Sequence, residues 1–299
     1  ASAADLHPTK LCVARGGAYH TTGGAPPPFN RLLNEQQLVA VHAIVAGVAR
    51  SVPYIVYGPP GTGKTTTVVE VVLQSVKRVQ GTELKILVCA PTNTAADVLC
   101  ARLAVVLSSR LELRRLRAYT RNKADVDEAV LRLSNWDASE RAFSFPSLDE
   151  LLKPRVVVAT LATAARLCCE GVPRGHFDMV LIDEAGQATE PEALAAPAML
   201  LGANGQLVLA GDPKQLGPVI HHTLAREHGL SMSVLERLMS RPLYQKDPSS
   251  GAYDARVLTK LVRNFRAHAS LLELPNSLFY EDDLLCCGDE LLLNCCIDW

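Results

Sequence analysis

Short apolar runs alternate with stretches of helical spacing along most of the chain, and each run ends in a polar or glycine-containing turn. The runs are Tyr54–Tyr57, Ile86–Ala90, Val156–Ala159, Met179–Ile182 and Leu207–Ala210. Strands that are apolar throughout are buried on both faces, and helices between them provide the crossovers that parallel strands need. The pattern therefore predicts an α/β fold with a parallel sheet, whose ligands bind at the carboxyl ends of the strands.

Helical spacing is clearest on either side of the first run. From Leu33 as far as Val48, apolar residues recur at the intervals of an amphipathic helix. After the run, residues 65–78 also predict a helix. The segment from 54 to 78 is therefore expected to fold as strand, loop and helix.

One interval breaks the alternation. Residues 107–153 are too many and too highly charged for a simple crossover between strands, so they predict an inserted small subdomain. Its first part carries a basic run opposed only by Glu112, with the members Arg110, Arg114, Arg115, Arg117, Arg121 and Lys123. Such a run is either a solvated helix face or a surface that contacts nucleic-acid phosphates. The sequence leaves both interpretations open.

The loop after the first run carries the most specific motif of the chain. Gly58-Pro-Pro-Gly-Thr-Gly-Lys64-Thr65 matches the phosphate-binding pattern G-x-x-x-x-G-K-[ST] at every fixed position. Its glycines let backbone N–H groups turn toward a phosphate, and the following helix adds partial positive charge at the same place. Lys64 is expected to reach the β- and γ-phosphates, and the Thr65 hydroxyl to ligate Mg²⁺. The residues predicted to bind ATP here are Gly58, Pro60, Gly61, Thr62, Gly63, Lys64, Thr65 and Thr66.

Two acidic residues follow the run Met179–Ile182. Paired carboxylates at the end of a buried strand suit a nucleotide site, so Asp183 is predicted to hold Mg²⁺ and Glu184 to orient or deprotonate the attacking water. After the next run, Gln215 could bridge the γ-phosphate and that water. An ordinary turn between strand and loop explains Gln215 equally well.

Small polar side chains follow two other runs. Pro91-Thr92-Asn93 comes after Ile86–Ala90, and Thr160 and Thr163 come at the end of the run that begins at Val156. Hydroxyl and amide groups at a helix start suit nucleic-acid phosphates. Capping of the next helix is at least as good an interpretation, and both can hold because a cap leaves other N–H groups free.

The amino-acid composition narrows the class of protein only slightly. A hydrophobic content of 48% with 20% charged residues over 299 positions is typical of a globular protein, and no apolar stretch is long enough to cross a membrane. The net charge of −1 indicates nothing about nucleic acid. A chain of this length with 9 cysteines does not make a disulfide scaffold, and the adjacent pairs among them are poorly spaced for zinc, so reduced thiols in a cytosolic or nuclear protein are expected.

Taken in chain order, these motifs resemble those of superfamily 1 helicases. Residues 33–37 resemble the Q motif and 58–65 motif I; 90–97 and 156–163 resemble motifs Ia and Ic; 183–187, 211–215 and 264–268 resemble motifs II, III and IV. The sequences Asp183-Glu-Ala-Gly-Gln187 and Gly211-Asp-Pro-Lys-Gln215 are typical of the up-frameshift-like branch of these helicases, whose members move 5′ to 3′ on single strands. The resemblance implies a RecA-like phosphate-loop NTPase that acts as an ATP-dependent helicase.

The resemblance also implies roles for individual residues. Gln37 would contact adenine, Phe265 would stack on it, and Arg266 would reach the γ-phosphate from a second lobe. Phe265 stands where the family usually has Tyr, which keeps the stacking face and loses a hydroxyl, and Ala269 replaces the usual Pro. The catalytic residues expected are Lys64, Asp183, Glu184, Gln215 and Arg266.

Further segments narrow the resemblance to the Moloney-leukaemia-virus-ten (Mov-ten) family of RNA helicases. They are residues 134–140, 228–239, 258–266 and 274–280. This implies single-stranded RNA as substrate, RNA-silencing proteins as partners, and a cytoplasmic location that can include ribonucleoprotein granules. No membrane association is expected. A DNA helicase of the same branch remains an alternative, because the motifs of an ATP site do not distinguish RNA from DNA.

The resemblance divides the chain into parts. Residues 1–29 are expected to be a linker or the tail of a preceding subdomain, 30–256 the first RecA-like domain, and 257–299 the truncated start of a second. Motifs V and VI do not follow motif IV, and the ending Cys295-Cys-Ile-Asp-Trp299 aligns with nothing. The chain alone is therefore expected to be a weak or inactive helicase. A non-catalytic module that binds ATP or a partner is the alternative from another class.

Overall fold

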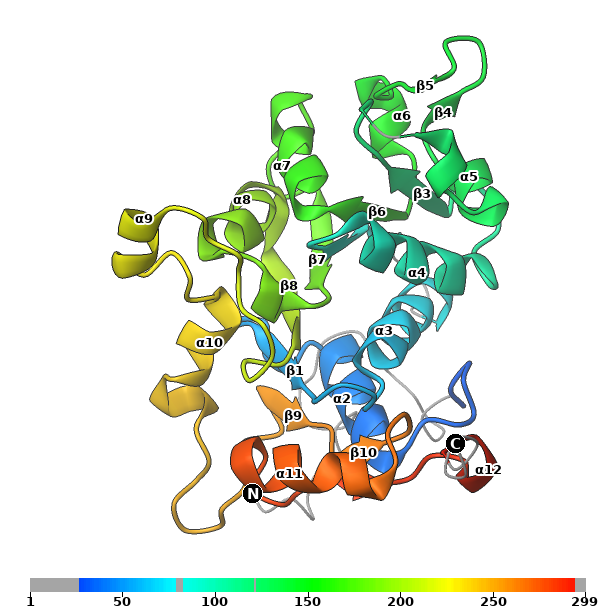
Figure 1. The fold of residues 1–299 in the computed structure, drawn as a ribbon. Coiled ribbons are helices and arrows are strands. Elements are labelled where there is room, and N and C mark those ends of the chain that lie inside the picture. Colours follow the sequence, from blue (N-terminus) through cyan, green and yellow to red (C-terminus); the bar gives the residue numbers. More distant parts are fainter. Residues whose placement is uncertain (1–26, 79–82, 121, 294–299) are drawn as a thin grey trace.

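The computed structural model describes residues 27–78, 83–120 and 122–293. Its core is a seven-stranded sheet with the strand order β3-β6-β2-β7-β8-β1-β9 (Figure 1). All neighbouring strands in this sheet are parallel, which confirms the predicted α/β class. The strands are β1 (Tyr54–Tyr57), β2 (Ile86–Ala90), β3 (Leu113–Leu116), β6 (Val156–Thr160), β7 (Phe177–Ile182), β8 (Leu201–Gly211) and β9 (Leu258–Lys260).

Helices cover both faces of the sheet. The helices α2, α3 and α4 pack on one face, and α7 and α8 pack together on the other (Figure 1). Because both faces are covered, every residue of β1, β2 and β6 is buried, as apolar strands require. The α-helices are α2 (Glu35–Val45), α3 (Lys64–Arg78), α4 (Asn93–Ala104), α5 (Glu128–Leu133), α6 (Leu148–Leu152), α7 (Leu161–Cys169), α8 (Glu190–Leu200), α9 (Thr223–Glu227), α10 (Val234–Met239), α11 (Ala269–Phe279) and α12 (Glu290–Leu293). Single 3₁₀ turns are η2 (Lys123–Asp125), η3 (Ala185–Gln187) and η4 (Pro242–Tyr244).

The predicted insertion 107–153 begins later than expected. Its residues Leu113–Leu116 form β3, which pairs with β6 at the edge of the main sheet. The strand escaped prediction because arginines interrupt its apolar pattern, although Leu113 and Leu116 are fully buried. The rest of the interval holds α5, α6 and a small antiparallel hairpin of β4 (Trp136–Asp137) and β5 (Ala142–Phe143).

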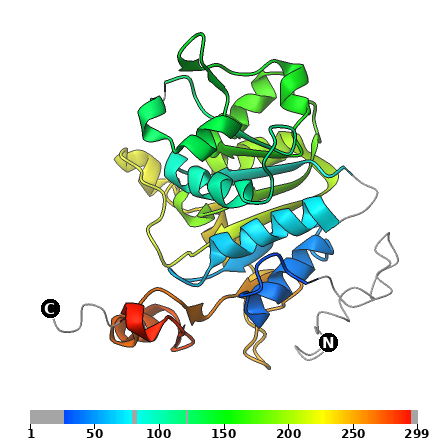
Figure 2. The same cartoon turned by 90° about the vertical axis from the view of Figure 1, so that its right-hand side faces the viewer.

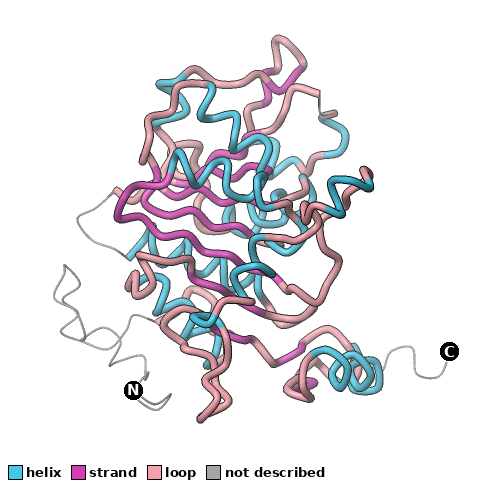
Figure 3. Tube along the Cα trace, turned by 90° about the vertical axis from the view of Figure 1, so that its left-hand side faces the viewer, coloured by secondary structure: helices cyan, strands magenta, loops and turns pink. Residues whose placement is uncertain are grey.

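The C-terminal part of the described chain also divides at a different place from the predicted boundary at 256. Strand β9 pairs with β1 and so belongs to the main sheet, because Val257, Leu258 and Leu261 are buried against it. The separate part starts at β10 (Arg263–Asn264), which pairs with β11 (Leu285–Cys286). Together with α11 and α12 it forms what we call the C-terminal unit, which is set off from the sheet in Figures 2 and 3.

Some predictions concern segments that the structure does not describe. Residues 1–26 of the predicted tail, Arg121 of the basic run and the pair Cys295-Cys296 lie outside the described residues. Within the described part of the chain, no helix is both long and apolar enough to span a membrane.

Candidate active site

The phosphate loop connects β1 to α3, and its glycines have conformations that other residues avoid. Gly61 has φ +78° and Gly63 has φ +88°. A Cβ at Gly61 would lie 2.7 Å from Cβ of Arg266, and a Cβ at Gly63 would lie 2.4 Å from Nε2 of Gln37. Both positions therefore need glycine for the backbone turn and for the close approach of neighbouring segments.

Side chains of the loop hold it in this shape. The Lys64 ammonium is buried and donates to the Gly58 carbonyl oxygen at 2.7 Å. The hydroxyl of Thr62, also buried, donates to the Pro59 carbonyl oxygen at 2.7 Å. Lys64 therefore lies over the concave side of the loop, where a phosphate would find both its charge and the backbone N–H groups.

Asp183 meets the phosphate loop from the end of β7. The Thr65 hydroxyl donates to its carboxylate at 2.7 Å, and only 2% of Asp183 is exposed. Burial raises the pKa of Asp183 to about 6, with a further contribution from Glu184, while Thr65 and Lys64 act in the opposite direction. A hydroxyl and a carboxylate at this distance are hard oxygen donors, and Mg²⁺ beside nucleotide phosphates prefers such ligands. The two residues thus fit a magnesium site.

Glu184 lies next to this pair in a strained backbone conformation. Its φ of 55° and ψ of 38° are left-handed, which is unusual for a residue other than glycine. Its backbone N–H donates to Asp183 at 3.1 Å, and its carboxylate accepts from the Gln187 amide at 3.2 Å. Strain of this kind persists where the surrounding structure holds a side chain in a required position.

Gln215 reaches the same edge from the loop after β8. Its side-chain amide donates to the Asp212 carboxylate at 2.9 Å. Asp212 is buried and also accepts from the Lys214 N–H at 2.9 Å and from the Tyr280 hydroxyl at 2.8 Å. The order β7-β8-β1 places Asp183, Gln215 and the phosphate loop on adjacent strands.

The C-terminal unit docks directly on the phosphate loop. The side-chain amide of Asn264 donates to the Pro60 carbonyl oxygen at 2.6 Å, and the Phe265 N–H donates to the Gly61 carbonyl oxygen at 3.0 Å. These bonds bring Phe265 and Arg266 to the loop, as the resemblance implies. Phe265 is 45% exposed, and its stacking on adenine stays a prediction.

Two predicted nucleotide contacts have partners within the protein. Gln37 forms a capping box with Asn34, and its amide nitrogen donates to the Thr62 carbonyl oxygen at 3.3 Å. Gln37 thereby joins α2 to the phosphate loop, and its contact with adenine stays a prediction. The Thr66 hydroxyl accepts from Arg102 of α4 at 3.1 Å.

The two turns predicted to contact nucleic acid lie side by side. Strands β2 and β6 are neighbours, with Ala90 opposite Thr160. Thr92 caps α4 by accepting from the Ala95 N–H at 3.2 Å, and Thr160 caps α7 by accepting from the Thr163 N–H at 3.4 Å. The capping interpretation is therefore confirmed at both turns. Thr92 is exposed, whereas Thr160 and Thr163 are buried.

Two members of the basic run, Arg115 and Arg117, lie on neither of the two surfaces that the sequence suggested, whereas Arg110 and Lys123 are exposed. Arg115 is fully buried in β3 and bonds to Asp97 at 2.9 Å and to the Asn93 side chain at 3.0 Å. Arg117 is 2% exposed and pairs with the same carboxylate of Asp97. Buried arginines need such partners, because an unpaired charge in the core is strongly destabilising. Both residues thus tie β3 and the segment directly after it to α4, which begins at Asn93.

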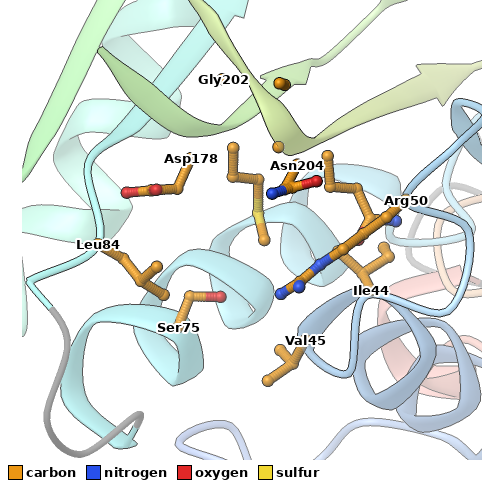
Figure 4. A pocket seen from close by; sticks show the side chains of 12 residues that line it. Ile44, Val45, Arg50, Ser75, Leu84, Asp178, Gly202 and Asn204 are labelled. Carbon is orange, nitrogen blue, oxygen red and sulfur yellow. The ribbon is translucent and has the colours of Figure 1, made fainter. Parts of the chain in front are cut away.

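A cavity of about 330 Å³ lies away from these turns (Figure 4). Its lining includes Ile44 and Arg50, the latter extending across the cavity, and Asp178 near the start of β7. Asp183 follows the opposite end of the same strand. The cavity therefore lies at the other edge of the sheet and takes no part in the nucleotide site.

Some residues of the site escaped prediction for a physical reason. Asp212 and Asn264 stand inside motifs recognised in the sequence, yet nothing local indicates the bonds that they make. Tyr280 lies 68 positions from Asp212. Contacts over such separations leave no local pattern, and only the fold reveals them.

The parallel sheet, the phosphate loop and the acidic pair together define a RecA-like α/β domain with a phosphate-loop nucleotide site. Sequence comparison then gives the family. The sequence model of the family described as "AAA domain" matches residues 32–145 and 135–223, and the chain belongs to this family.

Similar proteins are named after Mov-10. The MOV-10 protein of Gallus gallus is 46% identical over 261 residues, which cover 84% of this chain and 26% of that protein. The mov-10-B.1 protein of Danio rerio is 45% identical over 263 residues, covering 86% and 25% respectively. The RNA helicase Mov10l1 of Mus musculus is 42% identical over 278 residues, covering 91% and 22%. The chain thus spans about a quarter of the length of these relatives.

Proposed function

We propose that this chain is the ATP-binding core of an RNA helicase that hydrolyses ATP and moves 5′ to 3′ along a single strand. The observation that carries the proposal is the 2.7 Å hydrogen bond between Thr65 and Asp183. It joins the phosphate loop to the acidic pair in the arrangement that ATP hydrolysis needs. Two relatives are named RNA helicase Mov10l1, and these names support RNA as the strand that the protein binds.

In this proposal each residue has a defined task. Lys64 and the N–H groups of the loop bind the β- and γ-phosphates. Glu184 accepts a proton from the attacking water, and Gln215 orients that water against the γ-phosphate. Arg266 balances the negative charge that develops on the transferred group. Mg²⁺, held by Thr65 and Asp183, would neutralise charge between the β- and γ-phosphates.

The strand would bind at the turns over β2 and β6. Thr92, Asn93, Thr160 and Thr163 cluster there, beside the first turns of α4 and α7. The backbone N–H groups at these helix starts and the exposed Thr92 side chain suit backbone phosphates, which carry no sequence information. Pro91 directly follows β2 and begins the first of these turns. Binding through the backbone agrees with a motor that passes along any sequence.

The test uses the full-length protein with single-stranded RNA and single-stranded DNA of the same sequence. We expect ATP hydrolysis that RNA stimulates more strongly than DNA. Glu184→Gln should keep ATP binding and block hydrolysis, because the amide keeps the shape of the carboxylate but accepts no proton. Equal stimulation by DNA would favour a DNA helicase of the same branch. Hydrolysis by Glu184→Gln at the wild-type rate would remove Glu184 as the base.

A non-catalytic module would give a different result in the same assay. It would bind ATP without hydrolysing it, in the wild-type protein as in the Glu184→Gln variant. The strained left-handed backbone of Glu184 favours the enzyme, since a module that only binds needs no carboxylate held there.

Partners and location follow from the resemblance. We infer RNA-silencing proteins as partners and the cytoplasm, including ribonucleoprotein granules, as the location. The cysteines of the described residues are free thiols, which agrees with a reducing compartment. Co-purification with and without ribonuclease would separate protein partners from those bound through RNA.

A further inference from the structure

Tyr280 belongs to the C-terminal unit but reaches the edge of the main sheet. It follows the last residue of α11, and only 5% of it is exposed. Its hydroxyl donates to the Asp212 carboxylate at 2.8 Å. Asp212 directly follows β8 and is itself 3% exposed. A buried side-chain hydrogen bond therefore joins the C-terminal unit to the sheet.

The Asp212 carboxylate holds other groups at the same time. The oxygen that accepts from Tyr280 also accepts from the Gln215 amide at 2.9 Å. The second oxygen accepts from the Lys214 N–H at 2.9 Å. The Asp212 carboxylate thus links the Tyr280 hydroxyl to the Gln215 side chain through one oxygen atom.

Tyr280 is well placed for this because its own backbone is anchored. Its carbonyl oxygen accepts from the Lys260 ammonium at 3.2 Å, and Lys260 also pairs with Asp283 at 2.5 Å. Lys260 is the last residue of β9, so the anchor lies in the main sheet. Burial and the neighbouring Asp212 raise the pKa of the Tyr280 hydroxyl, which therefore stays a donor at neutral pH.

We propose that Tyr280 is a positioning residue for the γ-phosphate sensor. Its hydroxyl orients Asp212, which holds Gln215 toward the nucleotide. When the C-terminal unit moves away from the sheet, the bond to Asp212 breaks and Gln215 loses one of the groups that orient it. The position of the C-terminal unit then determines whether the site can hydrolyse ATP. This inference rests on the proposed function of Gln215.

The test is a double-mutant cycle on the full-length protein, with ATP hydrolysis measured at saturating single-stranded RNA. Tyr280→Phe removes only the hydroxyl. We expect it to lower kcat by about 3- to 10-fold while KM for ATP changes by less than about 2-fold, because the effect falls on the orientation of a catalytic group rather than on nucleotide binding. In a Gln215→Ala background, Tyr280→Phe should have no further effect on kcat, since the group that it positions is gone.

Tyr244→Phe is the matched control. Tyr244 is buried like Tyr280, and its hydroxyl donates to the Pro53 carbonyl oxygen at 2.7 Å, within the main body of the protein. Loss of that hydroxyl should lower the melting temperature to a similar degree and leave kcat unchanged. Its effect should be the same with and without Gln215.

The outcomes separate this inference from the proposed function. The positioning role would be overturned by a wild-type kcat in Tyr280→Phe. It would also be overturned if Tyr280→Phe lowered kcat by the same factor with and without Gln215. Neither result would affect the proposal that the protein hydrolyses ATP. Equal losses of kcat in Tyr280→Phe and Tyr244→Phe would show that the bond between Tyr280 and Asp212 contributes only to general stability. A wild-type protein without ATP hydrolysis would remove the proposed function, and the inference with it.

Discussion

Two kinds of turn lie along the carboxyl edge of one sheet. The turn between β1 and α3 is built on Gly61 and Gly63 with left-handed backbones. The turns after β2 and β6 instead place Thr92 and Thr160 in extended conformations, with φ of −118° and −73°. All three lead from a buried parallel strand into a helix, yet they treat the first N–H groups of that helix differently.

The difference lies in what each turn does with its hydrogen-bond donors. Thr92 and Thr160 each accept one backbone N–H with their own side chain, which stabilises the helix start. The glycines have no side chain with which to do so, and they leave room for a ligand to approach the backbone. A glycine turn is therefore suited to enclose a compact phosphate group, and a threonine turn to touch an extended strand from one side.

The largest effect should come from the charge that only the glycine turn carries. Lys64→Ala removes the ammonium that lies over the loop, and charge-assisted bonds to phosphate are among the strongest available. We expect nucleotide affinity to fall on the order of 100-fold, measured by titration with a fluorescent ATP analogue. Lys77→Ala is the control, because Lys77 lies on the same helix and, among the described residues, pairs with Glu112 away from the loop. Unchanged affinity in Lys64→Ala would refute the phosphate site.

Gly63→Ala tests the shape of the glycine turn without touching a charge. The new Cβ would lie 2.4 Å from the Gln37 amide, at a φ of +88°. We expect nucleotide affinity to fall at least about 10-fold, since the Cβ strains the loop at this φ and displaces the Gln37 amide from the Thr62 carbonyl oxygen.

Gly229→Ala isolates the contribution of backbone strain. Gly229 has nearly the same φ, +84°, but a Cβ there would meet nothing within 4 Å. This variant should lose about 1 kcal/mol of stability and keep its nucleotide affinity. If both alanine variants bound nucleotide equally well, the close approach of Gln37 would have no part in the site.

The comparison also explains how much the sequence could reveal. Glycines at Gly61 and Gly63 are required by backbone geometry, so the loop pattern is specific and its site was predictable. Apolar strands buried on both faces were predictable for the same reason, because few other structures tolerate them. Threonine at a helix start is common, so Thr92 and Thr160 left their function open.

The features that could not be predicted from the sequence depend on residues that lie far apart along the chain. Arg115 looked like a surface charge, but inside the sheet edge it pairs with Asp97 and donates a hydrogen bond to Asn93. Strand β3 was not predicted for the same reason, since a buried arginine interrupts the apolar pattern of the strand. Asp212 and Tyr280 come together only in the fold. Such pairs depend on tertiary structure that no local pattern records.

A third prediction concerns the buried carboxylate that faces the glycine turn. Asp183 is held in the core beside Thr65, and an ionised buried carboxylate destabilises the fold. In metal-free protein at pH 7.5, Asp183→Asn should raise the free energy of unfolding by about 1–3 kcal/mol, measured by chemical denaturation. The Thr65 hydroxyl can donate to the new amide or accept from it, so the hydrogen bond survives.

The pH dependence of this gain has a defined sign. The pKa of Asp183 is raised from 3.8 to about 6 in the folded protein, so the folded state binds more protons than the unfolded state between these values. Wild-type stability should therefore recover as pH falls through about 6, and the advantage of Asp183→Asn should vanish toward pH 4. An advantage that stayed constant from pH 8 to pH 4 would show that ionisation of Asp183 is not its cause.

The smallest effect should come from the threonine turn, where capping and strand binding must be separated. Thr92→Ala would remove the cap and the hydroxyl together, so it cannot distinguish them. Thr92→Asp keeps the cap, because aspartate caps helices at least as well as threonine, but it places a negative charge against the phosphates of the strand. We expect an unchanged melting temperature, and a fall of about 3- to 10-fold in affinity for single-stranded RNA that added salt diminishes. Ser147→Asp is the control for the added charge, because Ser147 is an exposed residue at the N-cap position of α6, within the insertion, where its hydroxyl bonds to Glu150. Equal RNA affinity in the two aspartate variants would show that Thr92 acts only as a helix cap and that the RNA strand does not bind at the β2 turn.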